Sequence, residues 1–264
     1  MRLTVLGSSS AGNSVLIQSG ETSVLVDCGF SAKEMNRRLL AVGADPTRLS
    51  GIVITHEHSD HIKGVSVLAR ATGTPVYLSA AVRDIFDFGP GRGEINFADP
   101  ITSSQPFQIG ALDFYPFSVP HDAVDPFAFT VRAAGVKAAC VTDLGYYTQL
   151  VAECLRDCDC IVIESNHDLE MLRIGPYPWV LKQRVMSRQG HVSNDELARF
   201  LREDFDGKAE HLILAHLSRT TNHPDIARLS ALHALESRGT LFFRDAEKRL
   251  KLARHDRPID WIEL

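Results

Sequence analysis

The chain has 264 residues, of which 44% are hydrophobic and 23% are charged, so it can bury a sizeable core and is predicted to be globular. Its formal net charge of -5 argues against a wholly basic, histone-like nucleic-acid binder, although it does not exclude a local basic patch. Residues 173–257 hold 16 Lys and Arg against 11 Asp and Glu. This net positive stretch suits a surface that receives anions, but ordinary solvated helix faces carry the same pattern.

The first residues lack the apolar segment of a signal peptide, because the chain turns polar at Gly7 and Ser8. No stretch approaches about 18 apolar residues, so we expect no membrane span and no membrane partner. The five cysteines are an odd number in a chain of this size, which indicates reduced thiols. These features predict a cytoplasmic protein and leave its oligomeric state open.

The predicted elements begin with three short segments that are rich in β-branched residues and separated by Gly and Ser. They predict antiparallel strands over residues 3–6, 15–18 and 23–27. Ser31 is expected to cap a helix that runs to about Val42, with Glu34 completing a capping box and Gly43 ending the helix. A buried strand over residues 51–55 then ends at a cluster of histidines.

The rest of the chain alternates apolar strand patterns with helical ones. Strands are predicted over residues 75–78, 112–119, 127–133, 136–142, 160–164, 211–215 and 239–243. Helices are predicted over residues 62–71, 146–156, 194–202 and 225–237. Because the two kinds of element intermix without a linker or a fixed-period repeat, we expect an α/β (α+β) sandwich forming one domain, residues 1–264.

The sharpest feature is the segment Thr-His-Glu-His-Ser-Asp-His at residues 55–61. It places four potential metal ligands within six residues, namely His56, His58, Asp60 and His61. In a turn that follows a strand, successive side chains fan outward from one point, so imidazoles and a carboxylate can converge on cations. This geometry suits two metal ions, and nitrogen and oxygen ligands favour Zn²⁺, Mn²⁺ or Fe over a thiolate-type site.

This H-x-H-x-D-H motif resembles the signature of the metallo-β-lactamase fold superfamily of hydrolases, whose members hold a dinuclear centre between two β-sheets. The resemblance implies a four-layer αββα sandwich and three further ligands that follow predicted strands, namely His121, Asp143 and His216. It also implies that one metal ion is held by His56, His58 and His121. The other ion is then held by Asp60, His61 and His216, and Asp143 bridges the two.

Four segments resemble a narrower group within this superfamily, the YycJ (WalJ) branch, and they lie at residues 7–14, 164–168, 190–194 and 216–218. That branch is associated with metal-dependent exonuclease activity on DNA from the 5′ end, and it is related in sequence to ribonuclease Z. The resemblance implies that the partner is nucleic acid, either single-stranded DNA or DNA 5′ ends.

Phosphodiester cleavage also suits the predicted ligands on chemical grounds. Two cations can lower the pKa of a shared water and clamp phosphate oxygens, and Asp60 could orient that water or accept its proton. The leaving oxygen needs a proton donor, for which the resemblance to ribonuclease Z-like enzymes indicates His191 paired with Glu164. His167 is predicted near the same mouth, either as another catalytic group or as a residue satisfied by its neighbours.

Substrate contacts are predicted in three places. Small residues after the first strand, Ser8, Ser9, Ser10 and Asn13, could let backbone N–H groups approach a phosphate, or they could form a simple tight turn. Ser218 and Arg219 follow His216 and could reach a phosphate. Arg184 lies in a stretch where cations surround Tyr177 and Trp179, which suits contact with single strands or an ordinary amphipathic surface.

Two further patterns are assigned supporting roles. Asp27 ends a strand before Cys28 and is expected to orient a metal-ligating histidine rather than to bind metal. Three cysteines are expected to be buried thiols rather than a metal cluster, because their spacing crosses a helix end and an apolar strand, and they are Cys154, Cys158 and Cys160.

The function favoured by these residues is that of a dinuclear-metal-dependent phosphodiesterase, a 5′-to-3′ DNA exonuclease in which a hydroxide shared by the metals attacks phosphorus. Two alternatives stay open. One is a hydrolase of small cyclic or di-ester phosphates, and the other is a binding module that retains metal without turnover. The same ligands accept Zn²⁺, Mn²⁺ and Fe, so the sequence does not name the metal.

Overall fold

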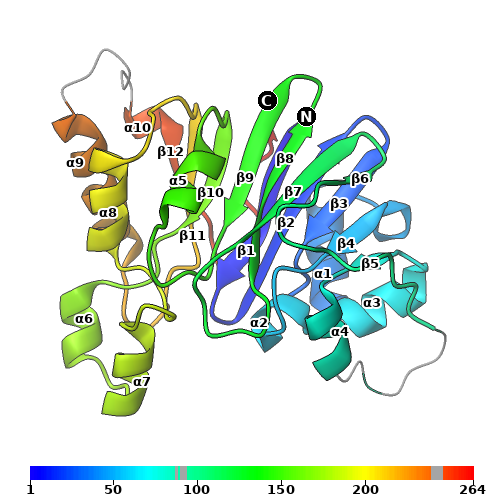
Figure 1. The fold of residues 1–264 in the computed structure, drawn as a ribbon, viewed down its shortest axis with the longest axis horizontal. Coiled ribbons are helices and arrows are strands. Elements are labelled where there is room, and N and C mark those ends of the chain that lie inside the picture. The colour runs from blue at the N-terminus through cyan, green and yellow to red at the C-terminus, as the bar shows by residue number, and fades with distance from the viewer. Residues whose placement is uncertain (87–88, 90–93, 239–245) are drawn as a thin grey trace. The chain divides into compact units, whose positions relative to one another are not determined.

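The computed structural model describes residues 1–86, 89, 94–238 and 246–264 (Figure 1). The strand predicted over residues 239–243 therefore lies outside the described residues. The chain divides into two compact units. The first comprises Met1–Ser118, Ala123–Val136 and Arg254–Leu264, and the second comprises Val119–Asp122 and Lys137–Ala253. The single domain expected from the sequence stays a prediction.

The first unit is built on a six-stranded sheet with the order β13-β1-β2-β3-β4-β5. Its strands are β1 (Arg2–Ser9), β2 (Gly12–Ser19), β3 (Thr22–Val26), β4 (Gly51–Val53), β5 (Val76–Tyr77) and β13 (Ile262–Glu263). The first three pair antiparallel, which confirms the predicted strand series, and β4 and β5 continue the sheet in parallel.

Helices cover one face of this sheet and fill the core of the first unit. They are α1 (Ala32–Ala41), α3 (Val65–Thr72) and α4 (Ala80–Ile85), with a short turn η1 (Pro46–Arg48). Leu6, Leu25 and Ile52 of the strands form one buried cluster with Met35 of α1 and Leu68 of α3. The N-cap predicted for α1 is confirmed, because the side chain of its Ser accepts a hydrogen bond from the main chain three residues on.

The helix predicted over residues 62–71 is instead two helices, α2 (Ser59–Ile62) and α3. The break falls at Gly64, whose N–H donates to the carbonyl of Cys28 at 2.8 Å instead of continuing α2. A Cβ atom at Gly64 would lie 2.3 Å from the carbonyl oxygen of Phe30, so the chain can pass here only as glycine. The break ties α2, which carries Asp60 and His61, to the end of β3.

Three further strands of the first unit form an antiparallel series, β6 (Phe107–Ile109), β7 (Leu112–Ser118) and β8 (Phe127–Ala133). Stacked rings support the pairing, with Phe107 and Phe114 separated by 5.2 Å between centroids. The N–H of Phe127 donates to the carbonyl of Thr55 at 3.0 Å, so β8 begins beside the segment that carries the histidine cluster.

The second unit is built on parallel strands in the order β12-β11-β10-β9. The strands are β9 (Val136–Val141), β10 (Cys160–Glu164), β11 (His211–Ala215) and β12 (Leu250–Leu252). The helices are α5 (Gln149–Leu155), α6 (Leu169–Ile174), α7 (Trp179–Val185), α8 (Asn194–Glu203), α9 (Pro224–Ser237) and α10 (Ala246–Arg249). Figure 1 shows α8 and α9 lying side by side.

The elements of both units confirm the predicted mixed α/β class. Parallel strands place their carboxyl ends at one edge of a sheet, so residues that follow β9, β10 and β11 gather there. The helix predicted over 146–156 begins three residues later, because the side chain of Thr148 caps α5. Helices α6 and α7 were not predicted, since few of their residues are buried and their apolar pattern is weak.

Within the described residues, none of the helices combines the length and the apolar character that crossing a membrane requires.

Gly29 sets how closely the end of β3 approaches α2. A Cβ atom at Gly29 would lie 1.7 Å from the main-chain oxygen of Asp60 and 2.6 Å from the main-chain nitrogen of Asn13. The N–H of Gly29 donates to the carbonyl of Asn13 at 3.0 Å. Any side chain at this position must therefore push the main chain of Asp60 away.

We expect Gly29→Ala to lower the free energy of unfolding by about 1–3 kcal/mol, because the added methyl group overpacks against a main chain that cannot yield locally. Urea unfolding measures the change. Ser10→Ala, in an exposed turn, is the control and should stay within about 0.5 kcal/mol of the wild type. Equal stability of the two variants would contradict the close packing at Gly29.

Candidate metal centre and catalytic site

The four ligands predicted in the histidine motif come together in the first unit. His56 and His61 are buried, and their ring centroids lie 4.1 Å apart. The ring of His58 lies 4.6 Å from that of His56, and Asp60 Oδ2 lies 3.5 Å from His61 Nε2. Three imidazoles and one carboxylate therefore gather where β4 ends and α2 begins, as the spacing of the motif predicted.

Asp27 orients this group, as the sequence indicated. Its buried carboxylate lies at the end of β3, with Oδ2 2.7 Å from His61 Nδ1. Thr55 donates its N–H to Asp27 Oδ1 at 2.9 Å, and its hydroxyl lies 2.9 Å from His56 Nδ1. A carboxylate that accepts from Nδ1 fixes the tautomer in which Nε2 carries the lone pair for a metal. Thr55 was not predicted, because a threonine next to a histidine is no signal by itself.

The loop of small residues positions Asp60 through a chain of hydrogen bonds within the first unit. Ser8 Oγ donates to Asn13 Oδ1 at 2.7 Å, and the N–H of Ser9 donates to the same oxygen at 3.2 Å. The amide of Asn13 in turn donates to Asp60 Oδ2 at 3.2 Å. These contacts hold the carboxylate of Asp60 in place. Ser10 is exposed in the turn, and the role of these four residues in substrate binding stays a prediction.

A second set of predicted ligands comes together at the carboxyl edge of the parallel strands in the second unit. Asp143 and His216 follow β9 and β11, and His216 Nδ1 lies 3.2 Å from Asp143 Oδ1. His121 Nε2 lies 4.0 Å from the same oxygen, and His121 Nδ1 lies 3.1 Å from the carbonyl oxygen of Gly190. Burial lowers the pKa of His121, which favours the neutral imidazole that a metal requires.

Glu164 is the centre of this second set. Its fully buried carboxylate places Oε1 2.6 Å from His216 Nδ1 and 2.9 Å from His191 Nδ1, while Oε2 accepts the N–H of Leu144 at 3.0 Å. Burial by itself would raise the pKa of Glu164, but attraction to His191 and hydrogen bonds with His191 and His216 outweigh it and lower the pKa to about 2. Glu164 is therefore ionised and orients two imidazoles at once.

Three residues of the two sets adopt a backbone conformation that is rare for non-glycine residues. Asp27, Asp143 and His216 have φ values of 62°, 61° and 53°. Each follows a strand, and a left-handed residue there turns the chain sharply at the strand end. Such a conformation costs on the order of 1–3 kcal/mol and persists only where the surroundings enforce it, which is typical of functional sites.

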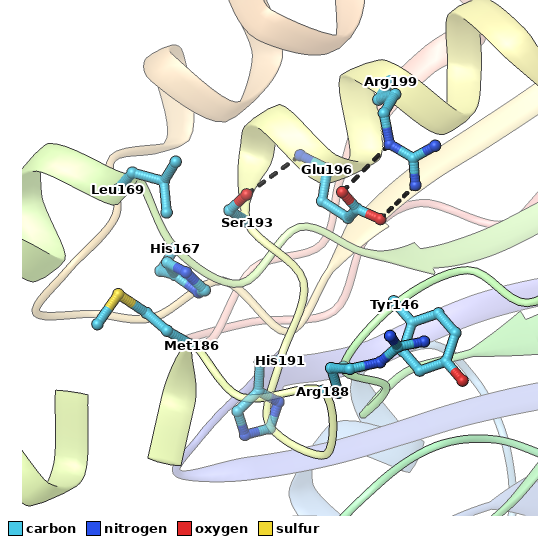
Figure 2. Close-up of a pocket in the computed structure, with 10 residues that line it drawn as sticks. Tyr146, His167, Leu169, Met186, Arg188, His191, Ser193, Glu196 and Arg199 are labelled. Carbon is cyan, nitrogen blue, oxygen red and sulfur yellow. Dashed lines mark hydrogen bonds and ion pairs between the residues drawn. The ribbon is translucent and has the colours of Figure 1, made fainter. Parts of the chain in front are cut away.

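The predicted pairing of His191 with Glu164 is present, and His191 also borders a pocket in the second unit. The pocket has a volume of about 410 Å³. Figure 2 shows its side chains, which come from the segments after β9 and β10, from the end of α7 and the loop that follows it, and from α8 and its N-cap. They include Tyr146, His167, Leu169, Met186, Arg188, His191, Ser193, Glu196 and Arg199.

His167 forms part of the wall of this pocket. It is 1% exposed, and Nδ1 has no hydrogen-bond partner among the residues that the structure describes. Burial lowers the pKa of His167 to about 4, so the imidazole is neutral near pH 7. Its main chain is fixed by the N–H of Asn194, which donates to its carbonyl at 2.8 Å. The predicted catalytic role of His167 is not tested by these contacts.

The other predicted substrate residues lie on the second unit, and two of the three have local partners. Ser218 Oγ accepts the N–H of Thr221 at 3.1 Å, and Arg219 is exposed in the adjoining turn. Arg184, on α7, forms an ion pair with Asp122. Their contacts with substrate stay predictions.

The expectation of buried thiols is confirmed for two of the three cysteines, whereas Cys154 is half-buried. Cys158 and Cys160 are buried, and burial raises the pKa of Cys160 to about 12, so it is a thiol rather than a metal-binding thiolate. Within the described residues, each cluster able to hold a metal consists of His, Asp and Glu side chains.

The donor atoms of both sets suit a divalent transition metal. His61, His121 and His216 each have Nδ1 beside an acceptor oxygen, which leaves Nε2 as the nitrogen able to coordinate a metal. Carboxylates and imidazoles together match the preferences of Zn²⁺, Mn²⁺ and Fe.

Comparison with known proteins places the chain in a family. Residues 22–217 match the family model described as the beta-lactamase superfamily domain. The chain is 34% identical over 239 residues to exodeoxyribonuclease YycJ of Bacillus anthracis, covering 90% of each chain. It is 33% identical over 236 residues to exodeoxyribonuclease WalJ of Streptococcus pneumoniae, covering 89% of this chain and 88% of that one.

A solved structure has the same fold. The metallo-β-lactamase fold protein YhfI from Bacillus subtilis matches with a TM-score of 0.74 at 20% identity, covering 98% of this chain and 99% of that one. The chain therefore belongs to the beta-lactamase superfamily, in the branch that contains the YycJ and WalJ enzymes. The fold, the family and the enzymatic class predicted from the motifs are confirmed.

We expect Asp27→Asn to weaken Zn²⁺ binding by about 10- to 100-fold, because the amide no longer enforces the tautomer of His61. Chelator competition measures the dissociation constant. Asn tolerates the left-handed backbone of Asp27, so the fold should persist. Asp45→Asn, in the exposed cap of η1, is the control. Unchanged Zn²⁺ affinity in folded Asp27→Asn protein would show that Asp27 does not orient the ligand.

The low pKa of Glu164 predicts a pH-dependent contribution to stability. A carboxyl group with a pKa of about 2 in the folded chain and about 4.3 in the unfolded chain stabilises the fold above the unfolded value and loses this effect as pH falls toward the folded value. The stability gap between metal-free wild type and Glu164→Gln should therefore shrink between about pH 5 and pH 3, as measured by urea unfolding. A gap that stays constant over this range would contradict an ionised Glu164.

Proposed function

We propose that the chain is a dinuclear-metal-dependent phosphodiesterase that degrades DNA from the 5′ end, with single-stranded DNA or DNA 5′ ends as substrate. The observation that carries the proposal is the hydrogen-bonded group of Glu164, His191 and His216, which joins a candidate proton donor to a candidate metal ligand through one ionised carboxylate. The similarity to proteins named as exodeoxyribonucleases over about nine-tenths of their length supports the choice of substrate.

In this proposal two divalent metal ions, Zn²⁺, Mn²⁺ or Fe, are held by the seven ligands that the family pattern assigns. These are His56, His58, Asp60, His61, His121, Asp143 and His216. When bound, such ions polarise phosphate oxygens and make water nucleophilic near neutral pH. The orientation of Nε2 in His61, His121 and His216 supports this assignment.

Side chains of the protein then accept a proton from the attacking water and donate one to the leaving oxygen. Asp60, held by the amide of Asn13, orients the attacking water and accepts its proton. His191 supplies a proton to the leaving oxygen from Nε2, because its Nδ1 is engaged by Glu164. The negative charge of Glu164 stabilises the positively charged imidazole before transfer and keeps the ring aligned.

Product analysis with end-labelled substrates tests the function. Labelled single-stranded DNA, RNA of the same sequence and a small cyclic phosphodiester are incubated with the protein in Mn²⁺ or Zn²⁺. Release of mononucleotides from the 5′ end of DNA supports the proposal. Cleavage of the cyclic phosphodiester alone would favour the small-substrate hydrolase, and binding of DNA without cleavage in either metal would favour a non-catalytic module.

We expect Asp60→Ala to abolish cleavage and His191→Ala to slow it by about 10²- to 10⁴-fold with the metal content preserved. Elemental analysis and single-turnover cleavage measure the two effects. His233→Ala, on the exposed face of α9, is the matched control and should behave as the wild type. Loss of the metals from His191→Ala would show that His191 is a ligand rather than the proton donor.

A further inference from the structure

The pocket beside His191 has lining groups that the proposed metal chemistry does not use. One part of its lining is apolar, since Leu169 is 39% exposed and Met186 is 40% exposed. Covering large hydrophobic side chains that are this exposed removes apolar surface from water and so favours binding of a ligand. A volume of about 410 Å³ is enough for one small organic ligand.

The pocket also presents a flat surface. The guanidinium of Arg188 lies 4.4 Å from the centroid of the Tyr146 ring, and Figure 2 shows the two groups stacked at one side of the pocket. Stacked Arg and Tyr planes of this kind are suited to a further planar group. Stacking of a base on an aromatic side chain contributes about 1–3 kcal/mol and tolerates any base.

Two of the charged side chains in the lining pair with each other. Arg199 is engaged by Glu196, with Nη2 2.6 Å from Oε1 and Nε 3.3 Å from Oε2. Arg188, the other charged side chain of the lining apart from the histidines, lies over the ring of Tyr146. A planar base that carries a phosphate suits this combination of an apolar wall and a cationic plane.

His167 adds a polar group with hydrogen-bonding capacity to spare. Its buried Nδ1 has no partner in the described part of the chain, and leaving such a nitrogen unsatisfied costs about 1–3 kcal/mol. Figure 2 shows His167 between Leu169 and Met186 in the wall of the pocket. A neutral imidazole offers one donor and one acceptor, as the edges of nucleobases do.

We propose that this pocket holds the nucleoside at the 5′ end of the strand, with its base stacked in the region of Tyr146 and Arg188 and its edge read by His167. The inference rests on the proposed function and names the part of the substrate that this region receives. His191 connects the pocket with the proposed catalytic group, because it borders the pocket and pairs with Glu164.

The direction of cleavage explains why the terminal nucleoside belongs on this side. Water adds to phosphorus, the bond from phosphorus to the 3′ oxygen of the terminal nucleoside breaks, and that oxygen takes the proton of His191. The products are a mononucleotide with a free 3′ hydroxyl and a shortened strand with a 5′ phosphate. The sugar that carries the leaving oxygen must therefore lie beside His191, and its base lies beyond it in the pocket.

Equilibrium binding tests the pocket without requiring cleavage. Calorimetry compares a deoxynucleoside 5′-monophosphate with deoxyribose 5-phosphate, which lacks the base. We expect the wild type to bind the nucleotide at least about tenfold more tightly, and Tyr146→Ala to lose most of this preference. Tyr115→Ala, on β7 in the first unit, is the matched control. Equal binding of the two ligands by folded wild-type protein would overturn the proposal.

Cleavage kinetics supply a second measurement. On DNA, Tyr146→Ala should raise KM by about 10- to 100-fold with a smaller change in kcat. An abasic 5′-terminal nucleotide should cost the wild type a similar factor, and the two losses should not add. His167→Asn should change the ranking of strands that differ only in the terminal base. Fully additive losses would place the base elsewhere.

The outcomes separate this proposal from the proposed function. Exonuclease activity on DNA without any preference for the base in binding or in KM would leave the function in place and refute the pocket. A preference for the nucleotide that Tyr146→Ala removes, in a protein that does not cleave DNA, would support the pocket and refute the exonuclease.

Discussion

The hydrogen bond between a buried carboxylate and the Nδ1 atom of an imidazole is the interaction on which both sets of predicted ligands depend. Asp27 makes it with His61 in one unit, and Glu164 makes it with His216 and His191 in the other. In each case the carboxylate decides which ring nitrogen carries the proton. The nitrogen that could coordinate a metal is thereby set by a residue that need not touch the metal.

This arrangement places unfavourable conformations and a buried charge at the ends of strands. Glu164 is ionised although fully buried, and Asp27, Asp143 and His216 hold left-handed backbone conformations. Parallel strands of the second unit bring Asp143, Glu164 and His216 to one edge, where the buried apolar residues of β9, β10 and β11 keep them in place. A rigid sheet is what makes the strained ends tolerable.

Glu164 also contacts both a candidate metal ligand and the candidate proton donor. One oxygen of its carboxylate is shared by a metal-ligand candidate and by the candidate proton donor, while the other anchors the main chain after Asp143. On the far side of His191 the pocket adds the stacked planes of Tyr146 and Arg188 and the apolar side chains of Leu169 and Met186. His191 therefore lies between the carboxylate of Glu164 and a surface suited to a planar group.

Local patterns in the sequence were sufficient to identify the helix cap at Ser31, the antiparallel strands of the first unit and the gathering of His and Asp side chains in the histidine motif, because each depends on neighbours in the chain. The motifs also indicated Asp27 as an orienting group and Glu164 as the partner of His191. Only the tertiary structure showed that Glu164 also engages His216 and that Thr55 donates a hydrogen bond to Asp27. It also showed that the predicted helix breaks at Gly64. The common pocket lined by Tyr146, His167 and Arg188 likewise emerged only from the structure. The reason is physical: these contacts join residues far apart in sequence, and their distances are set by how strands and loops pack, which no local spacing records.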